Sequence, residues 1–141
     1  MHKVYLSLGT NLGDKERNLC VAIEEIGRRI GTVKVQSAFL ATKPWGFSSD
    51  NDFLNAAVCC DTDMQPLDLL HETQKIEADM GRKAKSVGGH YSDRIIDIDI
   101  LLYDDLHINT AELTIPHPHM NERDFVLIPL KEIMPSEEIK K

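Results

Sequence analysis

The sequence predicts an α+β fold of the ferredoxin-like type, a split βαβ arrangement in which helices pack on an antiparallel sheet within a single compact domain, residues 1–141. Several observations predict it. Four segments have the apolar pattern of strands, two intervening segments have the apolar spacing of helices, and their order along the chain is β-α-β-β-α-β. A chain of 141 residues also has the usual length of one domain.

The first half of the chain is expected to form a strand, a helix and a second strand. Residues 3–8 alternate between apolar and polar side chains, as a half-buried strand does. Asp14 can cap the helix that follows, and Gly31 is expected to end it at the C′ position. The apolar side of this helix comprises Leu19, Ile23, Ile26 and Ile30. Residues 32–41 alternate again and predict one strand, with one side formed by Val33, Val35, Ser37 and Phe39.

The second half is expected to form a strand, a helix and a further strand, followed by shorter elements. Residues 53–62 predict the third strand, and a helix starts near Pro66 and ends at Gly81. The apolar side of this helix comprises Leu69, Thr73, Ile76 and Met80. The strand at 94–102 completes the sheet. Short strand-like pieces at 106–109 and 112–116 and a last helix at 125–133 follow.

Composition indicates an ordinary globular protein of the cytoplasm. The chain is 42% hydrophobic and 28% charged. No apolar run approaches the ~20 residues that cross a bilayer, and the N-terminus lacks the apolar core of a signal peptide. Cys20, Cys59 and Cys60 form neither a disulfide framework nor a Cys-x-x-Cys pair, so we interpret them as small buried hydrophobes. We expect a cytoplasmic monomer that binds no membrane.

The charge distribution favours a small anionic ligand over nucleic acid. The net charge of −7 argues against a nucleic-acid surface, which would be basic. Local cations are nevertheless concentrated in two places. Residues 82–94 hold Arg82, Lys83, Lys85 and Arg94 against the single anion Asp93, and residues 116–123 hold His117, His119 and Arg123. These two clusters indicate that the protein binds an anion.

Two aspartates, Asp97 and Asp99, interrupt the apolar strand RIIDIDILL. Residues two apart on a strand share a face about 6.6 Å apart, where two carboxylates repel by about 2–3 kcal/mol at an effective dielectric near 20. The strand could be an edge with a solvated polar face, or arginines could neutralise it. The flanking isoleucines and leucines are unlike a solvated edge, and hard cations such as Mg²⁺ prefer carboxylate oxygen. With a basic segment directly before the strand, the pair predicts a metal site that works together with phosphates.

The fragments DRIIDIDILL and LTIPHPHMNERDFVL resemble the signature of the 6-hydroxymethyl-7,8-dihydropterin pyrophosphokinases of folate synthesis. The resemblance extends over nearly the whole chain, through VYLSLGTNLGD, TKPWGF, DFLNAAV, QKIEADMGR and PLKEIMP in the order and spacing of that family. It implies transfer of a pyrophosphoryl group from ATP to the hydroxymethyl oxygen of the pterin, with release of AMP. It also implies two Mg²⁺ ions bound by Asp97 and Asp99.

The same resemblance implies the rest of the site. Arg82 and Arg94 would clamp the triphosphate and act in catalysis with the aspartates, since the planar guanidinium can hold two phosphate oxygens at once. Further ATP contacts would come from Gln74, Glu77, Ile100, Thr114, His117 and Arg123. The pterin would be bound by Thr42, Lys43, Trp45, Phe53, Asn55 and Phe125, with the two phenylalanines stacking on it and the Asn55 amide reading its edge. The chain departs from the family at Tyr91-Ser92-Asp93, where Trp-Gly-Pro is usual.

Two other functions remain open from the residues. His117 and His119 could belong to a zinc hydrolase, although Pro118 separates them and no third histidine is near. A ferredoxin-like module could instead bind a nucleotide without converting it, because this fold hosts many functions. The segment GTNLGD lacks the Gly-Lys-Ser/Thr ending of a P-loop, so we interpret Gly9 and Gly13 as permissive backbone in a tight turn.

Overall fold

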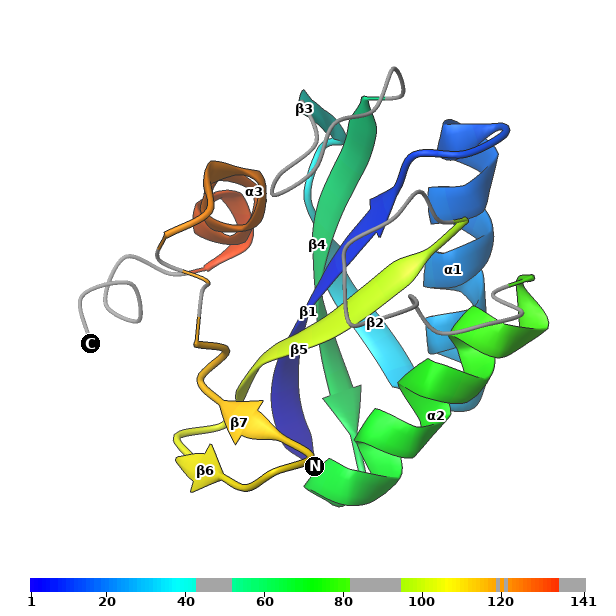
Figure 1. Cartoon of the computed structure of the whole chain (residues 1–141). Coiled ribbons are helices and arrows are strands. Elements are labelled where there is room, and N and C mark those ends of the chain that lie inside the picture. The colour runs from blue at the N-terminus through cyan, green and yellow to red at the C-terminus, as the bar shows by residue number, and fades with distance from the viewer. Residues whose placement is uncertain (43–51, 82–94, 119, 121, 135–141) are drawn as a thin grey trace.

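The computed structural model describes residues 1–42, 52–81, 95–118, 120 and 122–134 (Figure 1). Its strands are β1 (His2–Thr10), β2 (Gly31–Gln36), β3 (Leu40–Thr42), β4 (Phe53–Thr62), β5 (Asp97–Tyr103), β6 (Ile108–Asn109) and β7 (Thr114–Ile115). Its helices are α1 (Lys15–Arg29), α2 (Pro66–Asp79) and α3 (Asp124–Ile133).

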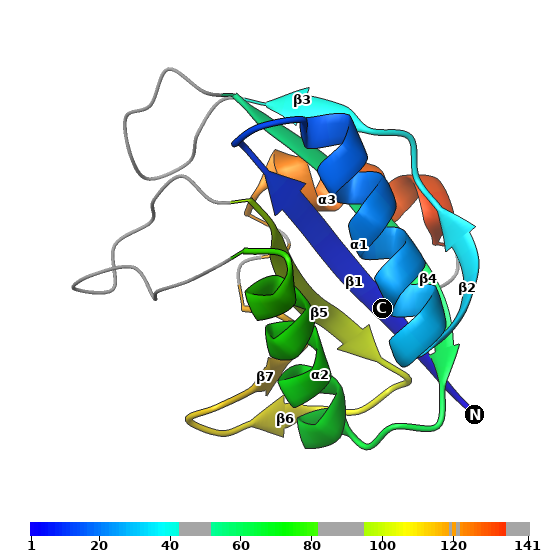
Figure 2. The same cartoon turned by 90° about the vertical axis from the view of Figure 1, so that its right-hand side faces the viewer.

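The main sheet is antiparallel and has the strand order β2-β4-β1-β5, with β3 paired to the N-terminal end of β4. The strands β6 and β7 form a separate two-stranded ribbon. Figure 1 and Figure 2 show α1 and α2 on one face of the sheet and α3 on the other. This is the split βαβ topology, so the predicted ferredoxin-like fold is confirmed.

The sheet separates two apolar clusters. The larger one lies against α1 and α2 and includes Val4, Leu6 and Leu8 of β1. The smaller one lies against α3 and includes Tyr5 of β1 and Leu101 of β5. Because successive strand residues point to opposite faces, positions 5, 7 and 9 of β1 face the side of α3.

The predicted starts of α1 and α2 are confirmed. The Asp14 carboxylate accepts a hydrogen bond from the Arg17 backbone N–H at 3.2 Å, which caps α1. Pro66 occupies the first turn of α2, where its missing N–H is no loss. Gly81, at a φ of 113°, follows α2 in the left-handed backbone region that glycine accepts without strain.

Gly31 follows α1 as predicted, but for another reason than a left-handed cap. It is already the first residue of β2, in register with Thr62 of β4. A Cβ at this position would lie 1.9 Å from the backbone oxygen of Asp61. The glycine is therefore required by the close approach of two backbones where the chain enters the sheet.

The prediction of one continuous strand at 32–41 is wrong. The register shifts between Val33 and Val35, and β2 ends at Gln36, before β3 begins at Leu40. The shift places Val33 against the core of α1 and α2 but leaves Val35 exposed. Alternation in the sequence cannot reveal such a bulge. A bulge exists only in the pairing of two strands, where two residues of one strand lie opposite one residue of the other.

The cysteines confirm the interpretation of buried hydrophobes only in part. Cys59 and Cys60 are buried in β4, and burial raises the pKa of the Cys60 thiol to about 11, so this thiol stays protonated at neutral pH. Cys20 is exposed on the outer side of α1, so its prediction was wrong. It directly follows Leu19, which belongs to the buried stripe of that helix.

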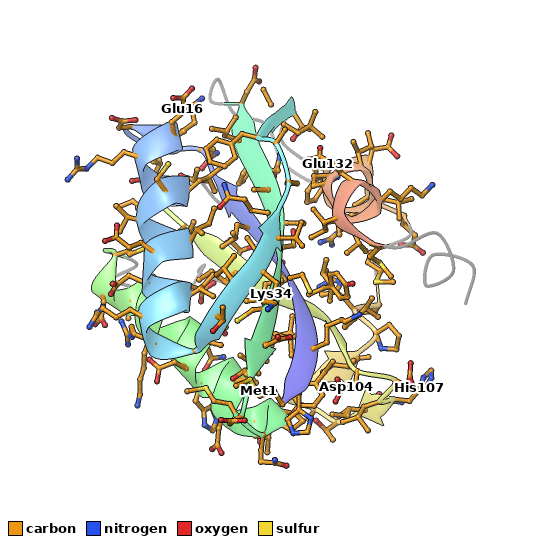
Figure 3. All side chains as sticks on the ribbon, turned by 180° about the vertical axis from the view of Figure 1, so that it is seen from behind. Met1, Glu16, Lys34, Asp104, His107 and Glu132 are labelled. Carbon is orange, nitrogen blue, oxygen red and sulfur yellow. The ribbon has the colours of Figure 1, made fainter. Side chains whose placement is uncertain are left out.

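The N-terminus is attached to the turn after β5. Asp104 lies at the same end of the molecule as Met1 (Figure 3), accepts a hydrogen bond from the Lys3 backbone N–H at 2.7 Å and contacts the His2 ring nitrogen Nδ1 at 2.8 Å.

None of the helices that the structure describes is long and apolar enough to cross a membrane.

Candidate active site

One row of residues crosses three adjacent strands on the sheet face that α3 partly covers. Asn55 on β4 and Asp97 on β5 are both in register with Gly9 on β1. Residues in register point to the same face, and neighbouring strands lie about 4.8 Å apart. The backbones of Asn55 and Asp97 therefore lie about 10 Å apart, with Gly9 between them.

Asp99 belongs to the next row of the same face. It is in register with Ser7 of β1, and Ser7 is in register with Ala57 of β4. Asp97 and Asp99 are each half-buried, and the strand places them on one side about 6.6 Å apart, as their spacing predicts. Ser7 is buried beside Asp99, so a hydroxyl lies next to this carboxylate in the sheet.

The strand that holds the aspartates is an edge strand, contrary to the sequence-based expectation. Within the part of the chain that the structure describes, β5 pairs with β1 alone in the main sheet, but other segments contact its outer side. The Ile98 backbone N–H donates to Glu77 Oε2 on α2 at 2.7 Å. The His117 backbone N–H donates to the Leu101 carbonyl at 3.0 Å. Ile98 and Ile100 point into the core of α1 and α2, which explains the apolar residues that had argued against an edge.

Asn55 is held in one orientation by β3. Its side chain is 2% exposed, and its Nδ2 donates to the Leu40 carbonyl at 3.1 Å and to Thr42 Oγ1 at 2.7 Å. The amide oxygen Oδ1 is consequently turned toward β1, where a Cβ on Gly9 would lie only 3.2 Å from it. The amide oxygen therefore lies beside the space that glycine leaves on the sheet.

One aromatic ring borders the same space, and a second lies near the start of α3. A Cβ on Gly9 would lie 3.6 Å from Cδ1 of Phe53, whose ring is half-buried. Phe125, near the start of α3, is half-buried against the smaller apolar cluster. The Arg123 guanidinium carbon lies 5.8 Å from the centroid of the Phe125 ring, although Arg123 is itself only 5% exposed. A cation and an aromatic ring are thus in contact at the N-terminus of α3.

The aspartate pair fits a magnesium ion bound together with a phosphate ligand. Among the residues that the structure describes, no group of three or more histidine, cysteine or acidic side chains is arranged to hold a metal ion. Mg²⁺ usually binds through one or two carboxylates and completes its octahedron with water and substrate phosphates. Two half-buried carboxylates on one face satisfy this requirement, whereas a closed protein cage would need more ligands.

The predicted nucleotide residues do not all share one environment in the structure. Gln74 is exposed on α2, whereas Glu77 is buried beneath β5. The Ile100 side chain is buried in the core, so a contact with ATP would have to come from its backbone. Thr114 on β7 and His117 are half-buried beyond the outer side of β5. Outside the described residues lie Lys43, Trp45, Arg82, Arg94 and His119.

Sequence reasoning missed the roles of Gly9 and Ser7. Gly9 was assigned to a turn, but β1 continues to Thr10, and only Gly13, at a φ of 69°, lies in the turn. The signal was present in the alternation, because extending the pattern of residues 3–8 by one step places Ser7 and Gly9 on one face. What the sequence alone could not show is that this face lies between Asn55 and Asp97.

Comparison with known proteins identifies relatives over most of the chain. Residues 5–135 match the family model described as 7,8-dihydro-6-hydroxymethylpterin-pyrophosphokinase. A 2-amino-4-hydroxy-6-hydroxymethyldihydropteridine pyrophosphokinase of Porphyromonas gingivalis is 49% identical over 133 residues, covering 94% of this chain and 90% of the relative. The protein of the same name from Bacillus subtilis is 40% identical over 130 residues, covering 92% of this chain and 76% of the relative.

Solved structures support the fold independently. A crystal structure of HPPK-DHPS from Plasmodium falciparum superposes with a TM-score of 0.76 and 18% sequence identity. It covers 95% of this chain, whereas this chain spans only 41% of that longer one. At this level of identity the likeness concerns the fold alone.

Proposed function

Because the chain belongs to the 7,8-dihydro-6-hydroxymethylpterin-pyrophosphokinase family, we propose that the row of Asn55, Gly9 and Asp97 is the place where its two substrates meet. The protein is an ATP-dependent enzyme of folate biosynthesis. It transfers the pyrophosphoryl group of ATP to the hydroxymethyl oxygen of 6-hydroxymethyl-7,8-dihydropterin and releases AMP. A nucleotide-binding module without catalysis, the alternative left open by the sequence, is not favoured.

The observation that supports this site is the arrangement across β1. An amide on β4 and a carboxylate on β5 face the same side, about 10 Å apart, and the residue between them has no side chain. A flat heterocycle can lie over Gly9 with its polar edge at Asn55. Its opposite end then points toward Asp97, which is where a phosphate-bound metal would be needed.

The pterin half of the site is formed by β3, β4 and α3. Asn55 offers its Oδ1 to a ring N–H, since Leu40 and Thr42 hold the other end of the amide. Phe53 and Phe125 supply the aromatic faces for stacking, a contact worth about 0.5–1.5 kcal/mol beyond area burial. Thr42 acts by positioning Asn55, and Lys43 and Trp45 complete the pocket in this proposal.

The ATP half of the site is formed around β5. Asp97 and Asp99 would hold two Mg²⁺ ions, and their half-burial leaves each carboxylate accessible to a ligand. When bound, these ions neutralise the triphosphate, align it with the pterin and lower the pKa of the attacking hydroxyl. Phosphoryl-type transfer requires positioning and charge stabilisation more than covalent help from side chains. The protein therefore acts chiefly by fixing where the carboxylates and the pterin oxygen lie.

Cationic and polar side chains would bind the rest of the nucleotide. Arg82 and Arg94 clamp the triphosphate in this proposal, and His117 and Arg123 contribute further phosphate contacts. The contact of Arg123 with the Phe125 ring supports this proposal, because a side chain that binds phosphate would then lie next to a ring that stacks on the pterin, as transfer between the two substrates requires. Gln74, Thr114 and the backbone of Ile100 complete the nucleotide side, whereas Glu77 is buried beneath β5.

A pair of variants tests the division of the site. Asn55→Ala is expected to weaken binding of the pterin about tenfold or more, because a buried partner is left unsatisfied, and to leave a non-hydrolysable ATP analogue with Mg²⁺ unaffected. Asp97→Ala is expected to weaken the Mg²⁺-dependent binding of that analogue and to leave the affinity for the pterin within about twofold of its original value. Titration calorimetry measures both ligands. Equal losses for both ligands in both variants would contradict the arrangement.

We further propose that the protein acts as a monomer in the cytoplasm. The pattern of cysteines supports a reducing compartment, since Cys59 and Cys60 are buried thiols and Cys20 lies alone on α1. Light scattering after size exclusion tests the monomer, for which a mass near 15.9 kDa is expected. A mass twice as large would contradict it.

A further inference from the structure

We propose that Glu77 is a positioning residue, which sets the geometry of Asp97 and Asp99 through the backbone of β5 instead of contacting ATP. This inference rests on the proposed function for the role of the aspartates. The resemblance that placed Glu77 in the nucleotide site gives it no such task. One contact of the Glu77 carboxylate is with the strand segment between the two proposed metal ligands.

The hydrogen bond of Glu77 is made at the centre of the aspartate pair. Glu77 Oε2 accepts from the Ile98 backbone N–H at 2.7 Å, and Ile98 is the one residue between Asp97 and Asp99. That N–H belongs to the peptide unit that joins Asp97 to Ile98. Fixing this peptide plane fixes the backbone rotation that directs the Asp97 side chain relative to that of Asp99.

The edge position of β5 explains why such a bond is needed. Among the strands that the structure describes, only β1 pairs with β5 in the main sheet, so the outward N–H of Ile98 has no described neighbouring strand to accept it. The hydrogen bond between Ile98 and Glu77 lies inside the protein, because Glu77 is 6% exposed and Ile98 is 5% exposed. A buried N–H without an acceptor would favour a shift of the strand toward water, and the spacing of the aspartates would shift with it.

The helix α2 positions the Glu77 carboxylate beside the Ile98 N–H. Leu69, Thr73 and Ile76 face the core from the same helix, and Glu77 extends their buried side toward β5. The flanking segments also approach each other one turn later, since a Cβ on Gly81 would lie 2.9 Å from Cδ1 of Ile95. The chain after α2 and the chain before β5 are thus close together beside the Glu77 hydrogen bond. An apolar residue at position 77 would pack here but could not accept a hydrogen bond.

Two substitutions separate positioning from direct binding. Glu77→Gln keeps an acceptor oxygen and removes the charge, whereas Glu77→Leu keeps the bulk and removes the acceptor. We expect Glu77→Leu to weaken the binding of Mn²⁺ with a non-hydrolysable ATP analogue about tenfold, measured by electron paramagnetic resonance. We expect the affinity of Glu77→Gln for Mn²⁺ with the analogue to stay within about twofold of that of the unmodified protein. The affinity for the pterin should be unchanged in both variants. Thr73→Val, one turn earlier on the buried side of α2, is the matched control and should change neither ligand.

Hydrogen exchange supplies a readout that depends on neither metal nor turnover. The Ile98 amide is expected to exchange slowly in the unmodified protein and in Glu77→Gln, and at least tenfold faster in Glu77→Leu. A fast Ile98 amide in the unmodified protein would overturn the proposal. So would a Glu77→Gln variant that loses Mn²⁺ affinity while its Ile98 amide stays protected, since the charge would then act on the ligand directly. Unchanged Mn²⁺ affinity in Glu77→Leu would also overturn it. These measurements are independent of the product formed, so a failure of the proposed function would be seen separately, as absence of AMP.

Discussion

Gly9 can be tested with a single methyl group. In Gly9→Ala the new Cβ would lie 3.2 Å from Asn55 Oδ1 and 3.6 Å from Cδ1 of Phe53. The first distance is a few tenths of an ångström shorter than a comfortable contact. Asn55 cannot easily retreat, because Leu40 and Thr42 hold its amide nitrogen from the other side. The methyl group would therefore occupy the space above β1 and cover the amide oxygen.

The expected effect on pterin binding follows from the loss of that oxygen as a partner. Leaving one polar group of the complex unsatisfied costs about 1–3 kcal/mol. At about 1.4 kcal/mol per factor of ten, the dissociation constant for the pterin should rise roughly ten- to a hundredfold. Binding of the ATP analogue should change little. The atoms nearest to the new Cβ belong to Asn55 and Phe53 of β4, whereas Asp97 is on β5, across β1 from them. Calorimetric titration of each ligand measures the two effects.

Stability distinguishes this effect from a damaged fold. Alanine within a strand is favoured over glycine by roughly 0.5–1 kcal/mol, which offsets the cost of the close contact. The midpoint of thermal unfolding of Gly9→Ala should therefore stay within about 4 °C of the unmodified protein. Gly27→Ala is the matched control, since its Cβ would lie an ordinary 3.9 Å from Val33. Unchanged pterin affinity in Gly9→Ala would refute the role given to this position.

Two further substitutions test the fold around the site. Gly31→Ala should destabilise the protein by several kcal/mol or prevent folding, because a Cβ 1.9 Å from the Asp61 backbone oxygen forces β2 and β4 apart, and urea unfolding would measure the loss. Burial acts to raise the pKa of Asp104, but hydrogen bonds from the Lys3 backbone and His2 outweigh it, so the folded pKa is lower than the ordinary 3.8. Its charge thus stabilises the fold above pH 3.8, and this contribution is lost as the pH falls through the folded pKa. Asp104→Asn, which tolerates the φ of 48°, should be slightly less stable than the unmodified protein at pH 7 and equal to it near pH 2; an equal deficit at both pH values would exclude the charge as the cause.

The elements with the clearest periodicity were predictable from the sequence. The buried side of α2, its start at Pro66 and its end before Gly81 follow from propensities that act within a few residues. These predictions were confirmed. The same is true of Asp14 as the cap of α1. Local interactions decide these features, so local sequence reveals them.

Features that depend on distant strands were not predictable. The bulge that exposes Val35 arises from pairing with β4, and the edge position of β5 arises from the order of the strands. Gly9 was misassigned for the same reason, because its neighbours Asn55 and Asp97 are distant in the chain. The residue types of the candidate site were predictable, but strand register decides which of them share a face.

We propose that the pyrophosphoryl group passes from ATP to the pterin at the face of the sheet that holds Asp97. The most direct test incubates the protein with ATP, Mg²⁺ and 6-hydroxymethyl-7,8-dihydropterin and resolves AMP from ADP by chromatography. Asp97→Ala and the exposed-loop control Asp63→Ala are run in parallel. We predict AMP and pterin pyrophosphate in equal amounts, a loss of at least a hundredfold in Asp97→Ala, and no loss in Asp63→Ala. ADP as the product, or full activity in Asp97→Ala, would contradict the account.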